Sequence, residues 1–173
     1  NNTSGSYNTA LGRSALSSNT TASNNTAVGY QAAMDNTTGT YNTAIGRASL
    51  SNNTTSNLNT AVGDYSLFDN TTGANNVALG ASALENNTTA SNNTAVGYQA
   101  GYSITASQYN TAIGRGALYS HTTGNGGNVA VGYDANRSLT TGSNNVSVGT
   151  NAAYSMTTGT NNTFIGGLAG DAI

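Results

Sequence analysis

The chain has 173 residues, and only four of them are cationic, all Arg, against six acidic residues. Nucleic acids and anionic membranes are bound through basic patches, so this charge excludes a nucleic-acid-binding protein and a polybasic membrane anchor. The chain contains no Cys, which excludes a disulfide framework. No apolar run approaches the ~20 residues of a transmembrane helix, so we expect no direct membrane insertion.

A motif of the form Asn-(Thr/Val)-Ala-(Val/Ile/Leu)-Gly recurs ten times with small variations. The spacing is 17 residues, except for one spacing of 18, where the pair Gly126-Gly127 supplies the extra residue. Such a short and regular repeat indicates a stack of similar structural units. Positions are counted here from the first Asn of each repeat, and these residues are Asn8, Asn25, Asn42, Asn59, Asn76, Asn93, Asn110, Asn128, Asn145 and Asn162.

The repeats occupy nearly the whole chain as a single repeat domain. Residues 1–7 match the end of a preceding repeat, residues 8–161 hold nine full repeats, and residues 162–173 hold a partial tenth. No signal peptide is visible, so we expect a mature form or a fragment of a longer array. Residues 8–75 resemble residues 76–144 repeat for repeat, which indicates duplication of a four-repeat block.

Each repeat predicts two short strands and two turns. The β-branched residues at positions two to four favour a strand, Gly at position five favours a turn with positive φ, and the common Ala-Leu at positions eight and nine suits a second strand. Helix-pair repeats need about 33 residues or more, so a 17-residue unit predicts one coil of an all-β, parallel β-solenoid. Ten coils about 4.8 Å apart predict a rod on the order of 48 Å long.

Side chains alternate along a strand, so positions two and four share one face and position three lies on the other. We expect the aliphatic residue at position four to point into the core of the coil. The small residue at position three then faces a partner that approaches closely, unless it only keeps a flat wall. The predicted oligomer-facing residues are Ala10, Ala27, Ala44, Ala61, Ala78, Ala95, Ala112 and Ala130.

The run Asn-(Thr/Val)-Ala-(Val/Ile)-Gly-x-x-Ala resembles the head repeats of trimeric autotransporter adhesins of the YadA-like kind. It is also similar to Asn-Thr-Ala-Val-Gly repeat arrays in bacterial and phage tail-fibre-like proteins. The resemblance covers residues 8–166 and is closest over residues 25–39 and 110–124. It implies a left-handed parallel β-roll that forms a homotrimer and serves as an exposed stalk or head for attachment. Adhesin-head coils are usually shorter, and a single-chain filament is the alternative.

Little in the chain suggests catalysis or cofactor binding. His121 is the only His, and the six carboxylates lie on different repeats. Asp35 and Asp69 share position eleven two coils apart, about 10 Å by stacking. That distance suits a glycosidase pair, but no cleft-forming loops interrupt the repeats. The Asp-rich glycine turns of calcium-binding solenoids are missing as well, so we predict no enzyme, no metal site and no cofactor.

Thr occupies position thirteen in every repeat that reaches it. Most of these residues precede a second Thr, so the pair points to opposite sides rather than forming one flat ice-binding array. A ladder of turn hydrogen bonds is the simpler interpretation, with ice binding as the alternative. The residues are Thr20, Thr37, Thr54, Thr71, Thr88, Thr105, Thr122, Thr140 and Thr157.

Position twelve carries an Asn-x-Thr sequence in the first five repeats, which makes these Asn candidate glycosylation sites. In later repeats the position is Ile104, His121, Leu139 and Met156, which indicates a half-buried site and counts against glycosylation. The candidate residues are Asn19, Asn36, Asn53, Asn70 and Asn87.

Position six often alternates between Arg and Tyr, which predicts a surface ladder of cation–π contacts between adjacent coils. Such a stripe stabilises the stack or contacts carbohydrate. Its residues are Arg13, Tyr30, Arg47, Tyr98, Arg115 and Tyr133.

Together, these patterns predict a structural protein on a cell or virion surface, a segment of an extracellular fibre, filament or adhesin head. The expected partners are further copies of the chain, a surface receptor or a carbohydrate. The alternative is a solenoid binding module whose flat face recognises ice or carbohydrate.

Overall fold

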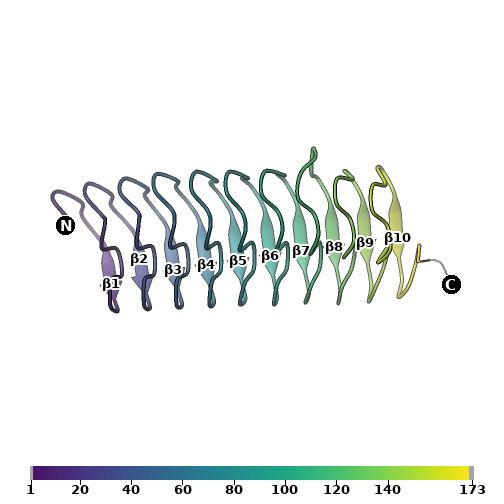
Figure 1. The fold of residues 1–173 in the computed structure, drawn as a ribbon, viewed down its shortest axis with the longest axis horizontal. Helices are drawn as coiled ribbons and strands as arrows, with labels where there is room; N and C mark the ends of the chain where they lie inside the picture. The colour runs from purple at the N-terminus through teal and green to yellow at the C-terminus, as the bar shows by residue number, and fades with distance from the viewer. Residues whose placement is uncertain (1, 172–173) are drawn as a thin grey trace.

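The computed structural model describes residues 2–171, which form one rod of stacked coils (Figure 1). Each coil contributes one strand to a single parallel sheet in the order β1 to β10, which confirms the predicted parallel β-solenoid. No helix in residues 2–171 is long and apolar enough to cross a membrane. The strands are β1 (Thr9–Leu11), β2 (Thr26–Val28), β3 (Thr43–Ile45), β4 (Thr60–Val62), β5 (Val77–Leu79), β6 (Thr94–Val96), β7 (Thr111–Ile113), β8 (Val129–Val131), β9 (Val146–Val148) and β10 (Thr163–Ile165).

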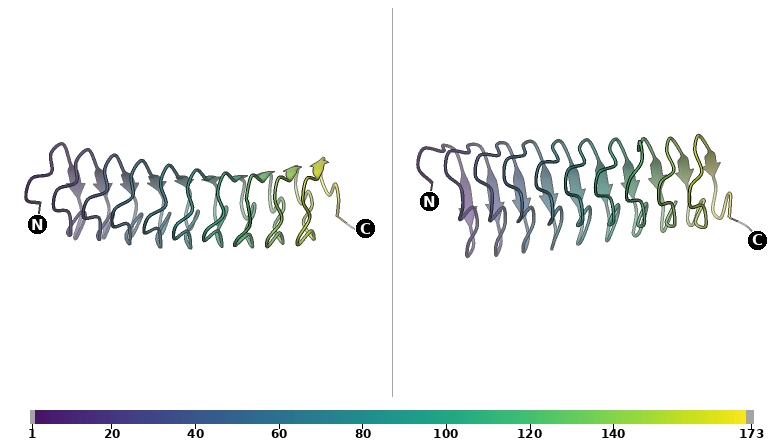
Figure 2. Two further views of the ribbon diagram at one scale, coloured as in Figure 1. Left: turned by 90° about the horizontal axis from the view of Figure 1, so that it is seen from above. Right: turned by 45° about the horizontal axis from the view of Figure 1, so that its top comes forward.

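Equivalent residues of neighbouring coils lie side by side along the rod (Figure 2). In β2 and β3, for example, Ala27 pairs with Ala44. The 18-residue repeat keeps this register, because its extra residue forms a loop that protrudes between β7 and β8 (Figure 1). Gly126 and Gly127 adopt φ values of 72° and 70° in that loop, a conformation that glycine reaches at little cost.

The predicted second strand at positions eight and nine is wrong. These residues form turns, and non-glycine residues at positions seven and nine have positive φ, as at Ala48 (53°) and Leu50 (51°). An extended strand cannot continue through this left-handed conformation, which costs about 1 kcal/mol or more per residue. Hydrogen bonds between coils hold the turns in place, since the Leu50 N–H donates to the Ser66 carbonyl at 2.9 Å.

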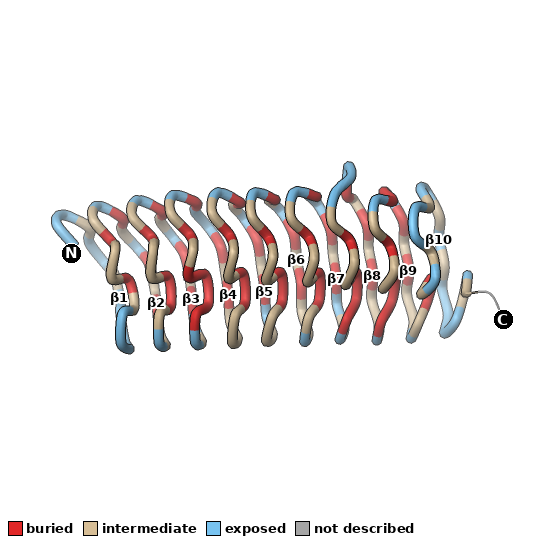
Figure 3. The backbone as a smooth tube through the Cα atoms, viewed as in Figure 1, coloured by how far each residue is buried: buried red, intermediate tan, exposed pale blue. Residues whose placement is uncertain are grey.

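The predicted orientation of the strand faces is also wrong. Position three belongs to the core of the coil and is fully buried from β2 to β8, while the aliphatic residues at position four are half-buried or exposed. Figure 3 shows buried segments that recur from coil to coil along the rod. The oligomer-facing assignment therefore fails for seven of the eight predicted Ala, and the eighth, Ala10 in the first strand, is exposed. The seven are Ala27, Ala44, Ala61, Ala78, Ala95, Ala112 and Ala130.

The core is too thin for large side chains on both of its walls. Leu residues at position nine, such as Leu67 and Leu84, fill the interior opposite the strand and are fully buried. Small side chains must then line the strand wall, which explains the Ala at position three. In the last coil the sizes are exchanged: Phe164 takes the Ala position, and a Cβ on Gly170 would lie 2.2 Å from its ring.

Two later coils move their apolar volume from position nine to position twelve. In the sixth coil Gly101 replaces Leu, and a Cβ there would lie 3.1 Å from Ile104 Cδ1. In the eighth coil Asn136 occupies position nine and the buried Leu139 occupies position twelve. Position twelve therefore belongs to the core, which explains why Asn, Ile, His and Leu can all be buried there.

The Gly residues at position five lie where the backbones of neighbouring coils come close together. Gly63 has φ +133°, and a Cβ on it would lie 2.6 Å from the Gly80 carbonyl carbon, a backbone atom of the next coil. The substitution Gly63→Ala should lower the free energy of unfolding by about 3 kcal/mol or more, because strain and backbone overlap add. Chemical denaturation followed by circular dichroism measures this change.

Gly167→Ala is the matched control. The nearest atom to a Cβ there is the Thr150 carbonyl oxygen at 3.8 Å, an ordinary contact, so stability should change by less than about 1 kcal/mol. Equal losses for the two variants would contradict the close stacking at position five.

Candidate functional site

The five candidate glycosylation sites lie inside the rod. Asn19, Asn36, Asn53, Asn70 and Asn87 are each no more than 1 % exposed. Each Nδ2 donates to the Oδ1 of the Asn one coil before it, for instance from Asn70 to Asn53 at 2.9 Å and from Asn87 to Asn70 at 2.7 Å. A glycan on Nδ2 would need the space and the proton that these bonds use, so the folded coils offer no glycosylation site here.

A second Asn ladder runs along position one, beside the start of each strand. The Asn59 N–H donates to Asn42 Oδ1 at 3.0 Å, and Asn59 Nδ2 donates to the Gly73 carbonyl at 2.9 Å. Asn59 Oδ1 in turn accepts from the Asn76 N–H at 3.0 Å, so one side chain satisfies a carbonyl at the end of its own repeat and the first N–H of the next. The same bond from backbone N–H to Oδ1 recurs at every step from Asn8 to Asn162.

The Thr residues at position thirteen form the predicted ladder of turn hydrogen bonds. Thr37 Oγ1 donates to the Thr54 carbonyl at 2.9 Å, and the same bond continues from coil to coil as far as Thr157. Their hydroxyl groups are therefore engaged with the backbone rather than presented as an outward array.

The ladder of Asn at position twelve ends where Ile104 follows Asn87, and Asn87 Oδ1 is buried without a partner among residues 2–171. Beyond Ile104 the position holds His121, which is fully buried and lies 2.8 Å from Ser107 Oγ through Nε2. Burial disfavours the charged imidazolium and lowers the pKa of His121 to about 4, although the Thr140 backbone acts in the opposite direction.

The position-six stripe exists only in part. Arg13 lies over the Tyr30 ring at 5.7 Å and Arg115 over the Tyr133 ring at 5.2 Å, as predicted. Arg47 instead lies 4.8 Å from the ring of Tyr65, at position seven, and makes an ion pair with Asp64 at 2.8 Å. Hydrogen bonds from that guanidinium lower the pKa of the Asp64 carboxyl.

Tyr98 shows no Arg contact, and Asp64 and Ala81 separate the two halves of the position-six stripe. The stripe is therefore a set of local surface contacts rather than one continuous binding track.

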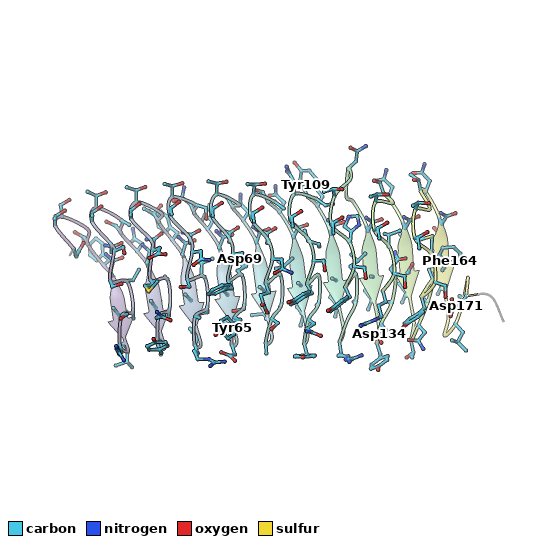
Figure 4. The ribbon with its side chains drawn as sticks, viewed as in Figure 1. Tyr65, Asp69, Tyr109, Asp134, Phe164 and Asp171 are labelled. Atoms are coloured by element: carbon cyan, nitrogen blue, oxygen red, sulfur yellow. The ribbon has the colours of Figure 1, made fainter. Side chains whose placement is uncertain are left out.

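A compact charged cluster lies along the same edge of the rod, and no pattern in the repeats predicts it. The Asp134 carboxylate is largely buried and accepts bonds from Arg137 at 2.9 Å and Arg115 at 3.1 Å. Arg137 also lies 4.4 Å from the Tyr119 ring, which stacks on Tyr102 at 5.1 Å. Asp134 and Tyr65 lie at one edge and Tyr109 at the opposite edge (Figure 4). The sequence hides this cluster because it joins positions six, seven and ten.

The remaining candidate groups for chemistry stay apart. Asp69 accepts a hydrogen bond from Asn52 at 3.1 Å, and Asp171 accepts one from the Ser155 N–H at 3.0 Å. Within residues 2–171, no three His, Asp or Glu side chains come together in a group that could hold a metal ion, and no pocket is found.

The outward side of the sheet forms a regular surface along the rod. We call positions two and four of the ten strands the strand face. Position two carries Thr or Val and position four carries Val, Ile or Leu, so the strand face bears no charge. Among its members, Ile45, Leu79 and Ile113 are 39 %, 37 % and 39 % exposed. Sequence reasoning missed this face because it placed these aliphatic residues in the core.

Comparison with known protein families, curated protein sequences and solved structures finds no match to this chain. The resemblance to adhesin-head and tail-fibre-like repeats therefore stays a prediction from the sequence. What the structure offers for function is a solenoid with a charge-free strand face along one side and Arg–Tyr contacts along an edge.

The substitution Asn70→Ala tests the buried Asn ladder. It removes the acceptor for Asn87 Nδ2 and leaves Asn53 Oδ1 without this donor, so the free energy of unfolding should fall by about 2–3 kcal/mol. Asn125→Ala, in the exposed loop after β7, should change stability by less than about 0.5 kcal/mol. A negligible loss at Asn70, measured by chemical denaturation, would show that the ladder adds little.

The buried His121 predicts a dependence of stability on pH. The folded pKa of about 4 lies below the ordinary 6.5, so between these values the unfolded chain binds a proton that the folded chain does not. The free energy of unfolding should therefore fall, by up to about 3 kcal/mol, as the pH drops from 6.5 to 4. Denaturation of the wild type and of His121→Leu measures the difference and cancels the carboxylates that both share. Parallel pH profiles for the two proteins would contradict this origin.

Proposed function

We propose that the chain is a segment of an extracellular fibre or adhesin head and provides a stiff, repetitive surface for attachment or assembly. The observation that carries this proposal is the continuous in-register bonding between coils, through the position-one Asn ladder, the Thr ladder and the backbone. The position-twelve Asn ladder adds to it as far as Asn87. Because each coil contacts only its neighbours, such a rod can lengthen by adding coils without changing its cross-section. Length and stiffness are the properties that a stalk or fibre needs.

Self-association is part of the proposal. The resemblance to adhesin heads implies a homotrimer, and the charge-free strand face supplies an outward apolar surface on which copies can meet. The mass in solution decides the number of copies. Adhesive contacts with a receptor or a carbohydrate then involve surfaces that self-association leaves free, such as the exposed rings of Tyr30, Tyr98 and Tyr133.

The alternative function is a binding module that recognises ice or carbohydrate. One observation favours it: the outward Thr at position two, such as Thr26 and Thr43, recur with the regular spacing of the strands beside aliphatic residues. A flat array of this kind differs from the position-thirteen Thr, whose hydroxyl groups are bonded to backbone.

Location is the first test of the proposed function. Antibodies raised against the folded chain and detected with gold particles should label filaments or the surface of intact source cells or virions. Labelling that occurs only after the cells are permeabilised would overturn an extracellular role. A strain in which the gene is deleted provides the control for specificity.

The alternative is tested directly by freezing. Purified chain at ~0.1 mM should show no thermal hysteresis beyond that of albumin at the same concentration. A clear freezing-point gap that the strand-face substitution Thr43→Lys abolishes would favour the ice-binding module over the fibre.

A further inference from the structure

The side chains of the strand face differ in length from coil to coil, and we call this variation its relief. Position two is nearly level, because Thr and Val have the same shape and size. Position four alternates between a long and a short side chain over the first eight coils. Its residues there are Leu11, Val28, Ile45, Val62, Leu79, Val96, Ile113 and Val131.

The exposed fractions follow the same alternation. Leu11, Ile45, Leu79 and Ile113 are exposed, and the Val residues between them are half-buried. Side chains of one row therefore form ridges on every second coil, with a shallow gap at each Val. The ridges repeat about every 9.6 Å, twice the spacing between strands.

We infer that this face binds the same face of a second copy of the chain, with the ridges of each copy seated in the gaps of the other. A partner surface must present ridges with the same spacing. Another copy does so because it has the same residues at position four. A uniform lattice of small groups, as on ice, would rest on the ridges and leave the gaps unfilled. The inference deepens the self-association that belongs to the proposed function and rests on it.

The relief selects one arrangement of the two copies. A two-fold axis parallel to the strands, midway between β4 and β5, places position four of one copy against position four of the other in reversed coil order. Each long residue then meets a Val: Leu11 meets Val131, Ile45 meets Val96, Leu79 meets Val62, and Ile113 meets Val28. A two-fold axis along the rod instead places position four against the level row at position two, where the alternation has no counterpart.

Position two suits the same arrangement. Thr26 then meets Thr111 and Thr43 meets Thr94, so paired hydroxyl groups can bond to each other across the interface. The strand face contains no charged group whose burial would oppose the contact.

The size of the contact predicts a moderate affinity. Eight strands about 4.8 Å apart and three residues long span about 38 Å by 10 Å, so two copies cover about 760 Å² in projection. The accessible area exceeds the projected area because the side chains protrude. This places the contact near the ~1,000 Å² lower bound of specific interfaces. We expect dissociation in the micromolar range.

Sedimentation equilibrium of the purified chain tests the contact. The mass should approach twice the 17.3 kDa of the chain as the concentration rises to ~1 mM. Leu79→Thr keeps a side chain suited to a strand and should weaken the association about 10-fold or more, since the substitution appears twice in the dimer. Tyr98→Thr, at an exposed residue beyond the glycine turn, should leave the association unchanged.

A size swap tests the register. Val62→Leu alone sets the new Leu side chain against Leu79 at two places and should weaken the association by about 10-fold or more. Adding Leu79→Val to the same chain restores one long and one short residue and should return the affinity to within about 3-fold of the wild type. Both substituted side chains are partly exposed at the strand face, and thermal melts of each variant confirm that folding is intact.

Three outcomes would overturn the pairing. A chain that stays monomeric up to ~1 mM has no such contact. A mass three times that of the chain would exclude the two-fold pairing, whether or not it responds to Leu79→Thr, and would leave the fibre proposal standing. Failure of the double swap to recover the affinity lost by Val62→Leu would exclude this register.

Discussion

The structure depends on the hydrogen bonds that identical residues make across consecutive coils. An Asn side chain carries a donor and an acceptor on one amide, so it can accept from one neighbour and donate to the other without end. At position one it donates to a carbonyl at the end of its own repeat and accepts from the first N–H of the next, and at position twelve it joins side chains of the same kind. Such a ladder requires equivalent residues to stay in register from coil to coil, which favours repeats of constant length. The extra residue of the seventh coil is tolerated because it loops outward and leaves the ladders in register.

The thin core explains how residue types are distributed between inside and outside. Two walls of the coil lie so close that the strand wall carries Ala and the opposite wall carries one Leu. The larger aliphatic residues of the strands have no room beside that Leu and lie on the outer side of the sheet. The surface that carries the proposed function is therefore apolar and regular, while much of the interior is amide. A rod built in this way is stabilised by bonds along its length and offers apolar area for further assembly on its side.

The repeat, the strand at positions two to four, the glycine turn and the Thr ladder could all be predicted from the sequence. Alternation showed that positions two and four share a face but not which face is buried, and the usual preference for buried Val and Ile favoured the wrong one. Left-handed Leu residues such as Leu50 were unpredictable because Leu rarely adopts that conformation alone. One available signal was the replacement of Leu by Gly101 together with that of Asn by Ile104, which marks position twelve as part of the core.

The most direct measurement of the Asn ladders is hydrogen exchange of the side-chain amides by nuclear magnetic resonance. The Nδ2 protons of Asn53, Asn59 and Asn70 should exchange at least ~100-fold more slowly than those of two exposed residues, Asn75 and Asn125. This result requires that the amides are bonded within an intact stack. Equal and fast exchange at all of these residues would contradict the account, because it would leave the coils without the bonds that set their period.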